Sequence, residues 1–205
     1  AVGAGRAGDL GVPRAGAKVR RPELGVEAGT DGEALGAALP AWLGEGVAAG
    51  VRAFPSSAVE APPSSGTALT GGVVLCPCSM GTLARVAVGF SSNLVERAAD
   101  VALKERRRLV LVPREAPLSE IHLENMLRLT RLGAMILPAA PGFYHRPKTV
   151  QDLLDHVVGK VLDALGVAHS LGARWKGARP AGEDLGLERP PGRAPDGERA
   201  GGGGR

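Results

Sequence analysis

The feature that most constrains the fold is a regular alternation of short apolar runs and longer amphipathic stretches over residues 71–167. The apolar runs at residues 72–76, 108–113 and 134–137 have the length of buried strands. The stretches between and after them predict helices, near residues 79–83, 93–104, 118–132 and 150–165. Short apolar strands that alternate with helices form a parallel sheet with helices on both faces. The sequence therefore predicts an α/β fold.

The two flanks of this region differ from it in composition. Residues 1–70 are rich in Ala, Gly and Pro and show no sustained period, which predicts an irregular start over residues 1–15. Residues 176–205 have almost no large apolar side chain and end in a glycine run, which predicts a disordered tail. One domain over residues 16–175 remains between these segments.

Composition argues against several classes of protein. No apolar run reaches the roughly 18–20 residues of a membrane span, and the first residues lack the apolar core of a signal peptide, so we expect a cytoplasmic protein. Aromatic residues make up only 3%, which disfavours nucleic acid as a partner. Cys76 and Cys78 have neither redox nor zinc spacing, which predicts two buried thiols and no metal site.

Suggestive loops follow all three predicted strands, where ligands bind in parallel sheets. The turn at residues 77–82 presents hydroxyls and amides at a helix start, as a phosphate or flavin site does, or as an ordinary strand-to-helix turn does. Arg114 and Glu115 follow the second strand as a cation beside a carboxylate. Tyr144, in the loop after the third strand, either binds phosphate or anchors the loop by packing.

Three stretches resemble consecutive blocks of the UbiX flavin prenyltransferases: PCSMGTLA, NLVERAADVALKERRRLVLVPREAPLSEIHLENM and GFYHRPKTVQDLLDHVVGKVLDALGV. The resemblance is dense and in order over residues 64–175. A looser similarity reaches back to residue 16, where AGAKVRRPELGVE resembles the second helix of the family.

The resemblance implies a Rossmann-like (flavodoxin-like) flavoprotein that transfers a dimethylallyl group from dimethylallyl monophosphate to reduced FMN. The prenylated FMN would serve UbiD-type decarboxylases, and the reaction would need no metal. The resemblance also implies a homododecamer built from trimers, with active sites where subunits meet.

The resemblance also implies roles for individual residues. Lys104 and Glu115 match catalytic positions; from the residues, Glu115 either protonates the leaving phosphate or accepts a ring proton, and both roles stay open. The positions that match flavin contacts are Ser79, Met80, Gly81, Thr82 and Arg114. The positions that match the prenyl-phosphate site are Arg97, Tyr144, Lys160 and Trp175.

The chain departs from the family pattern at two places. The family opens with a strand and a glycine-rich phosphate loop, and neither is recognisable here; the family also commonly has lysine where this chain has Gly81. Three interpretations follow: an active flavin prenyltransferase, an FMN-dependent cysteine decarboxylase of the same fold, or an inactive remnant that binds flavin weakly.

Overall fold

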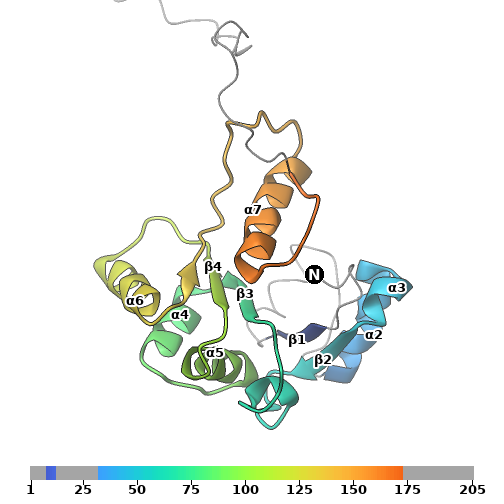
Figure 1. Cartoon of the computed structure of the whole chain (residues 1–205), viewed down its shortest axis with the longest axis vertical. Coiled ribbons are helices and arrows are strands. Elements are labelled where there is room, and N and C mark those ends of the chain that lie inside the picture. Colours follow the sequence, from blue (N-terminus) through green and yellow to red (C-terminus); the bar gives the residue numbers. More distant parts are fainter. Residues whose placement is uncertain (1–7, 13–31, 173–205) are drawn as a thin grey trace, which may run out of the picture. The chain divides into compact units, whose positions relative to one another are not determined.

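The structure, a computed structural model, describes residues 8–12 and 32–172 (Figure 1). Its central element is a parallel sheet of three strands in the order β3-β4-β5. The strands are β3 (Val73–Cys78), β4 (Leu109–Pro113) and β5 (Met135–Ile136). All five residues of β4 are buried, because β4 lies between two strands and helices cover both of its faces. The α/β fold and the three strands predicted from apolar runs are confirmed.

Four helices accompany this sheet: α4 (Met80–Ala87), α5 (Leu94–Lys104), α6 (Glu120–Arg131) and α7 (Val150–Leu165). Local chemistry sets their ends. The Ser79 hydroxyl accepts a hydrogen bond from the Thr82 amide at 3.2 Å and starts α4, while Thr149 and Asp152 form the predicted capping box of α7. Gly166 ends α7 with φ 69°, a left-handed conformation that glycine adopts without strain.

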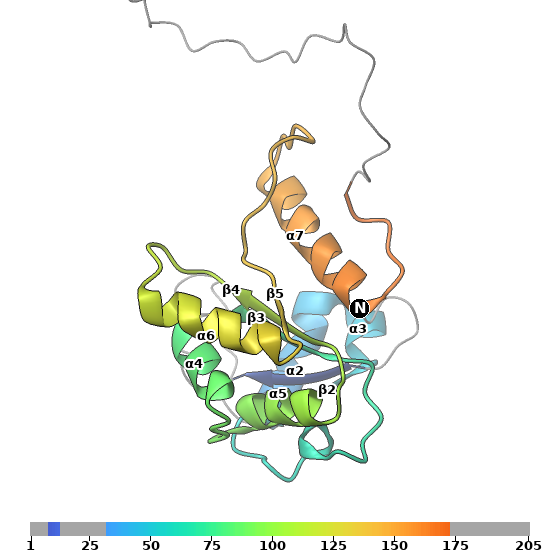
Figure 2. The same ribbon diagram turned by 60° about the vertical axis from the view of Figure 1, so that its left-hand side comes forward.

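The helices cover both faces of the sheet (Figure 2). One core cluster joins Leu75 of β3 and Leu111 of β4 to Leu83, Ala99 and Leu129, which come from α4, α5 and α6. A second cluster packs Val161 of α7 against Val110 and Val112, whose side chains point to the opposite face of β4. The near-continuous apolar run of β4 therefore reflects burial on both faces.

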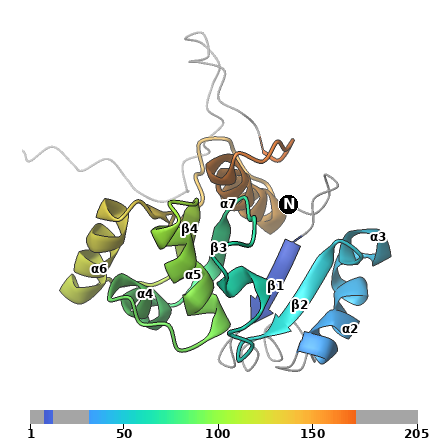
Figure 3. The same ribbon diagram turned by 60° about the horizontal axis from the view of Figure 1, so that its bottom comes forward.

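The expected irregularity of residues 1–15 is wrong for residues 8–12, which form a strand. β1 (Gly8–Val12) and β2 (Val51–Pro55) pair in parallel, with α2 (Gly32–Leu43) packed against β2 and α3 (Glu45–Ala48) following (Figure 3). A short 3₁₀ turn spans Pro62–Ser64. Leu35 and Leu39 are buried in α2, and they stand among alanines and glycines, which makes the apolar signal too sparse to show a helical period.

The described strands form two sheets rather than the single sheet we expected. A cavity of about 460 Å³ lies between β1 and the edge of β3 that does not pair with β4, and it is lined in part by Gly8, Val74 and Ala98. The segment at residues 16–28, Trp175 and the predicted tail at 176–205 lie outside the described residues.

Among the described residues, no helix combines the length and the apolar character that crossing a membrane requires.

Candidate functional site

The turn between β3 and α4 places a polar surface over a buried base. Ser79 and Gly81 are exposed, whereas Met80 is buried and holds the turn against the core. The Ser79 hydroxyl donates to Thr82 Oγ1 at 3.0 Å. The first amides of a helix have no partner within the helix, so this turn offers donors as well as hydroxyls to a ligand.

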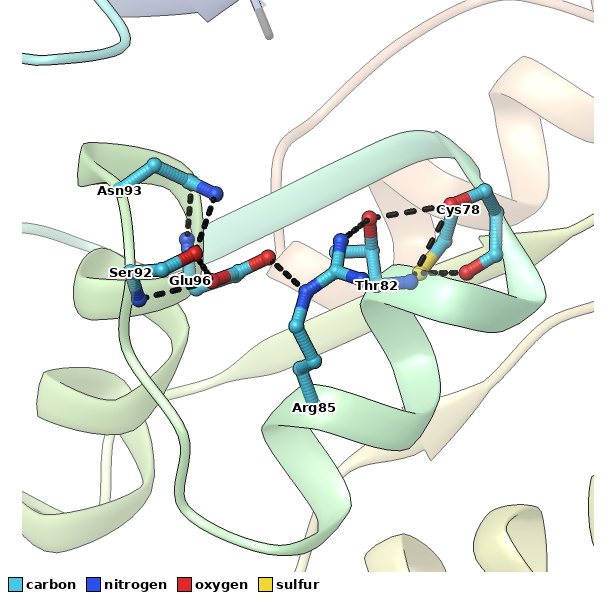
Figure 4. Close-up of polar contacts among 7 residues, drawn as sticks. Cys78, Thr82, Arg85, Ser92, Asn93 and Glu96 are labelled. Carbon is cyan, nitrogen blue, oxygen red and sulfur yellow. Dashed lines mark hydrogen bonds and ion pairs between the residues drawn. The ribbon is translucent and has the colours of Figure 1, made fainter. Parts of the chain in front are cut away.

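An ion pair between the partly exposed Arg85 and the buried Glu96 lies beside this turn (Figure 4). Arg85, one helical turn after Gly81, donates from Nε to Oε1 of Glu96 in α5 and from Nη2 to Thr82 Oγ1 at 3.4 Å. Oε2 of Glu96 accepts from the amide and the hydroxyl of Ser92, at 2.9 and 2.7 Å. The polar groups of the turn are thus linked to a carboxylate that is 1% exposed.

The pKa values of two titratable groups in this region differ from their ordinary values. Burial raises the pKa of Glu96, but hydrogen bonds from Ser92 and Arg85 outweigh it, so the pKa lies below the usual value and the carboxylate stays charged. Burial raises the pKa of the Cys78 thiol to about 12, against a smaller opposite effect of Arg85. Cys78 is therefore a protonated, unreactive thiol.

Arg114 and Glu115 lie directly after β4, and both are exposed. Because β3 and β4 are adjacent and parallel, with Cys78 opposite Pro113, these residues follow the same sheet edge as the Ser79 turn. Glu115 Oε1 accepts from the Ala116 amide at 3.2 Å. The structure therefore brings the two strand-end motifs predicted from sequence to one edge.

The loop after β5 places the Tyr144 ring against two histidine rings. The His145 and His156 rings stack with centroids 4.9 Å apart, and the Tyr144 ring meets both edge-on at 5.5 and 5.7 Å. Lys160 lies one turn after His156 in α7. Burial lowers the pKa of His156, and the charges of His145 and Lys160 lower it further. Tyr144 and Lys160 therefore both lie near His156.

Within one chain, Lys104 lies on the amino-terminal side of β4, whereas Glu115 follows its carboxyl end. Lys104 ends α5, and it lines a cavity with Val88 and Gly89, which follow the far end of α4. The eight residues of α4 separate that end from Ser79 by roughly 12 Å. Lys104 also bonds to Glu105, and Arg97, near the start of α5, pairs with Asp100 at 2.8 Å.

Sequence reasoning missed three contributors to these sites. The Arg85–Glu96 pair had no signal, because its members lie on different helices with no characteristic spacing. The stacking of His145 on His156 was not predicted, although His156 and Lys160 have the four-residue spacing of neighbours on a helix face.

Cys76 is exposed, which corrects the prediction of two buried thiols. No group of three or more acidic, histidine or cysteine side chains within the described ranges could hold a metal ion.

Comparison with known proteins identifies the family of this chain. The Flavoprotein family matches residues 51–162, from the start of β2 into α7. Flavin prenyltransferase UbiX of Pseudomonas aeruginosa is 59% identical over 141 residues, which are 67% of this chain and 68% of the relative. UbiX of Alkalihalophilus pseudofirmus is 61% identical over 115 residues, which are 56% of this chain and 58% of the relative. The chain thus spans less than two thirds of the second relative's length.

Solved structures show the same relationship. A dodecameric FMN-dependent UbiX-like decarboxylase from Escherichia coli O157:H7 has a TM-score of 0.70 and 41% identity, covering 82% of this chain and 83% of its own. AnUbiX (PadA1), solved with FMN and dimethylallyl pyrophosphate, has a TM-score of 0.63 and 37% identity, covering 85% of this chain and all of its own.

The parallel sheet and the ligand loops at one edge define a Rossmann-like flavoprotein. The chain belongs to the Flavoprotein family, and within that family to the UbiX flavin prenyltransferases.

The turn after β3 fits a flavin ring. A side chain added at Gly81 would meet only Arg85 Nη1, at 3.5 Å, so the surface over the turn is open to a planar group. Hydroxyls and amides of Ser79 and Thr82 border that surface and match the polar edge of a flavin. The described residues therefore fit the ring of FMN.

Proposed function

We propose that this protein is a flavin prenyltransferase, which transfers a dimethylallyl group from dimethylallyl monophosphate to reduced FMN. The observation that carries the proposal is the meeting of the Ser79 turn and the Arg114-Glu115 loop at one sheet edge. Both motifs lie within residues 51–162, which match the Flavoprotein family.

FMN, when bound, supplies the nucleophilic ring that accepts the prenyl group. Ser79, Thr82 and the amides around Gly81 would hold one edge of that ring, with Met80 packed beneath the turn. Arg114, which follows β4 at the same sheet edge, is the further flavin contact. These residues orient the acceptor and take no proton from it.

The prenyl-phosphate site would lie around Tyr144 and Lys160. When the allylic carbon–oxygen bond breaks, its electron pair leaves with the phosphate, so negative charge grows on phosphate oxygen. The Lys160 ammonium and the Tyr144 hydroxyl stabilise that charge. Glu115 either protonates the phosphate or accepts the proton that the ring loses; both roles use the same exposed carboxyl group. Trp175 completes this proposed set from outside the described residues.

Lys104 and Arg97 would act in the site of a neighbouring copy. Within one chain Lys104 lies beyond the far end of α4 from Ser79, so a direct role there requires another subunit. The E. coli structure is of a dodecamer. A homododecamer of this chain, with sites where subunits meet, would bring Lys104 of one copy to Glu115 of another.

Hybrid oligomers test this arrangement. Lys104→Ala and Glu115→Gln should each abolish transfer, and oligomers assembled from a mixture of the two should regain part of the activity. Light scattering on the unmodified chain should show a large assembly. No recovery in oligomers shown to be mixed would place the two residues in one subunit's site and overturn the arrangement.

The other two interpretations are less well supported. The grouping of Tyr144 with Lys160 near His156 suits a prenyl phosphate, which a cysteine decarboxylase does not bind. An inactive remnant would bind FMN weakly and transfer nothing. Delivery of prenylated FMN to a UbiD-type decarboxylase, and a cytoplasmic location in keeping with the free thiols of Cys76 and Cys78, belong to the same proposal.

The decisive assay incubates the chain with reduced FMN and dimethylallyl monophosphate without oxygen and detects prenylated flavin by mass spectrometry. Because AnUbiX was solved with the pyrophosphate, both donors should be compared. Product from the monophosphate that disappears in Glu115→Gln, but not in the surface variant Arg131→Gln, would support the proposal. FMN binding without product from either donor would refute it.

A further inference from the structure

Arg85 has no role in the reaction described above, yet it occupies an unusual position. It extends back along α4, so that its guanidinium lies over the first turn of the helix beside Gly81. It contacts Thr82 with one nitrogen and Glu96 with another. Its side chain remains 43% exposed, so the charge is not sealed in the core.

Glu96 fixes the position of Arg85, and Gly81 lies beside its guanidinium. A Cβ added at Gly81 would stand 3.5 Å from Arg85 Nη1, an ordinary contact distance, so the guanidinium borders the flavin turn. Glu96 is buried, and its second oxygen is held by two hydrogen bonds from Ser92, so the carboxylate is a fixed anchor. An arginine held at one end by a fixed carboxylate loses little freedom when its other nitrogens meet a ligand.

We propose that Arg85, anchored on Glu96, is a positioning residue of the flavin turn, which fixes the Thr82 hydroxyl and supplies positive charge that favours reduced FMN over oxidised FMN. The inference rests on the proposed function. Reduced flavin carries a negative charge on its ring at neutral pH, and oxidised flavin does not. A cation beside the flavin edge therefore stabilises the reduced form selectively.

The test is anaerobic potentiometric titration of FMN bound to the full chain. Arg85→Gln should weaken the binding of reduced FMN three- to tenfold relative to oxidised FMN, which lowers the midpoint potential by about 15–30 mV for a two-electron couple. Arg85→Lys keeps the cation and should restore most of the potential. The difference should shrink at high salt, because the guanidinium is partly exposed.

Two further variants keep the inference falsifiable if Arg85→Gln does not fold. Arg85→Gln combined with Glu96→Gln leaves a neutral amide pair in the same space, and it should lower the potential less than Arg85→Gln alone, because the Glu96 charge is removed with the guanidinium. Arg131→Gln, an exposed arginine at the end of α6, should leave the potential unchanged. If the role of Arg85 were purely structural, Arg85→Gln would alter the melting temperature without altering the ratio of the affinities for reduced and oxidised FMN.

The outcomes separate this inference from the proposed function. Equal potentials in the unmodified chain, in Arg85→Gln and in the double variant would overturn the role of Arg85 and leave flavin binding intact. Absence of FMN binding by the unmodified chain would overturn the flavin site, and this inference with it.

Discussion

Replacing Glu96 by Ala should destabilise the protein more than the loss of any exposed ion pair. The Glu96 side chain is fully buried and accepts hydrogen bonds from Arg85 and, twice, from Ser92. Removing one partner of a buried pair costs about 3–5 kcal/mol. Arg85 is 43% exposed and regains water when released, so we expect about 2–3 kcal/mol.

Urea denaturation followed by far-UV circular dichroism measures this loss. With a slope of about 2 kcal/mol per molar urea, the midpoint should fall by about 1–1.5 M. Glu96→Gln keeps an oxygen acceptor and should lose roughly half as much. The matched control is Glu105→Ala, which removes a glutamate from the exposed pair with Lys104 and should leave the midpoint almost unchanged. Equal, small shifts for Glu96→Ala and Glu105→Ala would refute the argument.

Three other predictions follow from single contacts. Lys160→Ala should weaken binding of the prenyl phosphate roughly tenfold or more in isothermal titration calorimetry. Tyr144→Phe should weaken it less, because only one neutral hydrogen-bond donor is lost. Unchanged affinity in both variants would show that the phosphate binds elsewhere. The pKa of His156 is lowered in the folded state, so the contribution of His156 to stability is present above about pH 6.5 and is lost as the pH falls. His156→Phe should therefore make the melting temperature depend less on pH over that range. An unchanged dependence of the melting temperature on pH would contradict this. Gly166→Ala should cost about 1 kcal/mol or more in urea denaturation, since φ is 69° and the added Cβ would meet Arg108 Nη1 at 2.5 Å; a neutral result would show that the helix end relaxes freely.

Much of the site was predictable because its residues lie close together in sequence. Ser79 and Thr82 are three residues apart at a helix start, and Arg114 and Glu115 directly follow an apolar run. Such local signals place residues at strand ends, and the parallel geometry of the sheet then brings the strand ends to one edge. The capping box of Thr149 and Asp152 was predictable for the same reason.

The position of Lys104 follows from the order of the elements rather than from a local motif. It ends the helix that leads into β4, and such a helix ends beside the amino ends of parallel strands, opposite the end that carries Glu115. The structure places Lys104 beyond the far end of α4 from Ser79, which is why a neighbouring copy enters the proposal.

The sequence by itself determined the alternation of strands and helices, the helix caps and the loops that carry Ser79 and Glu115, because these depend on hydrophobic period and on contacts only a few residues apart. Only the tertiary structure decided that Arg85 would meet Glu96, that His145 would stack on His156, and that β1 and β2 would form a sheet separate from β3. These arrangements join segments from different elements. They are selected by burial, by pairing of buried charge and by fit between surfaces, none of which leaves a repeating pattern along the chain.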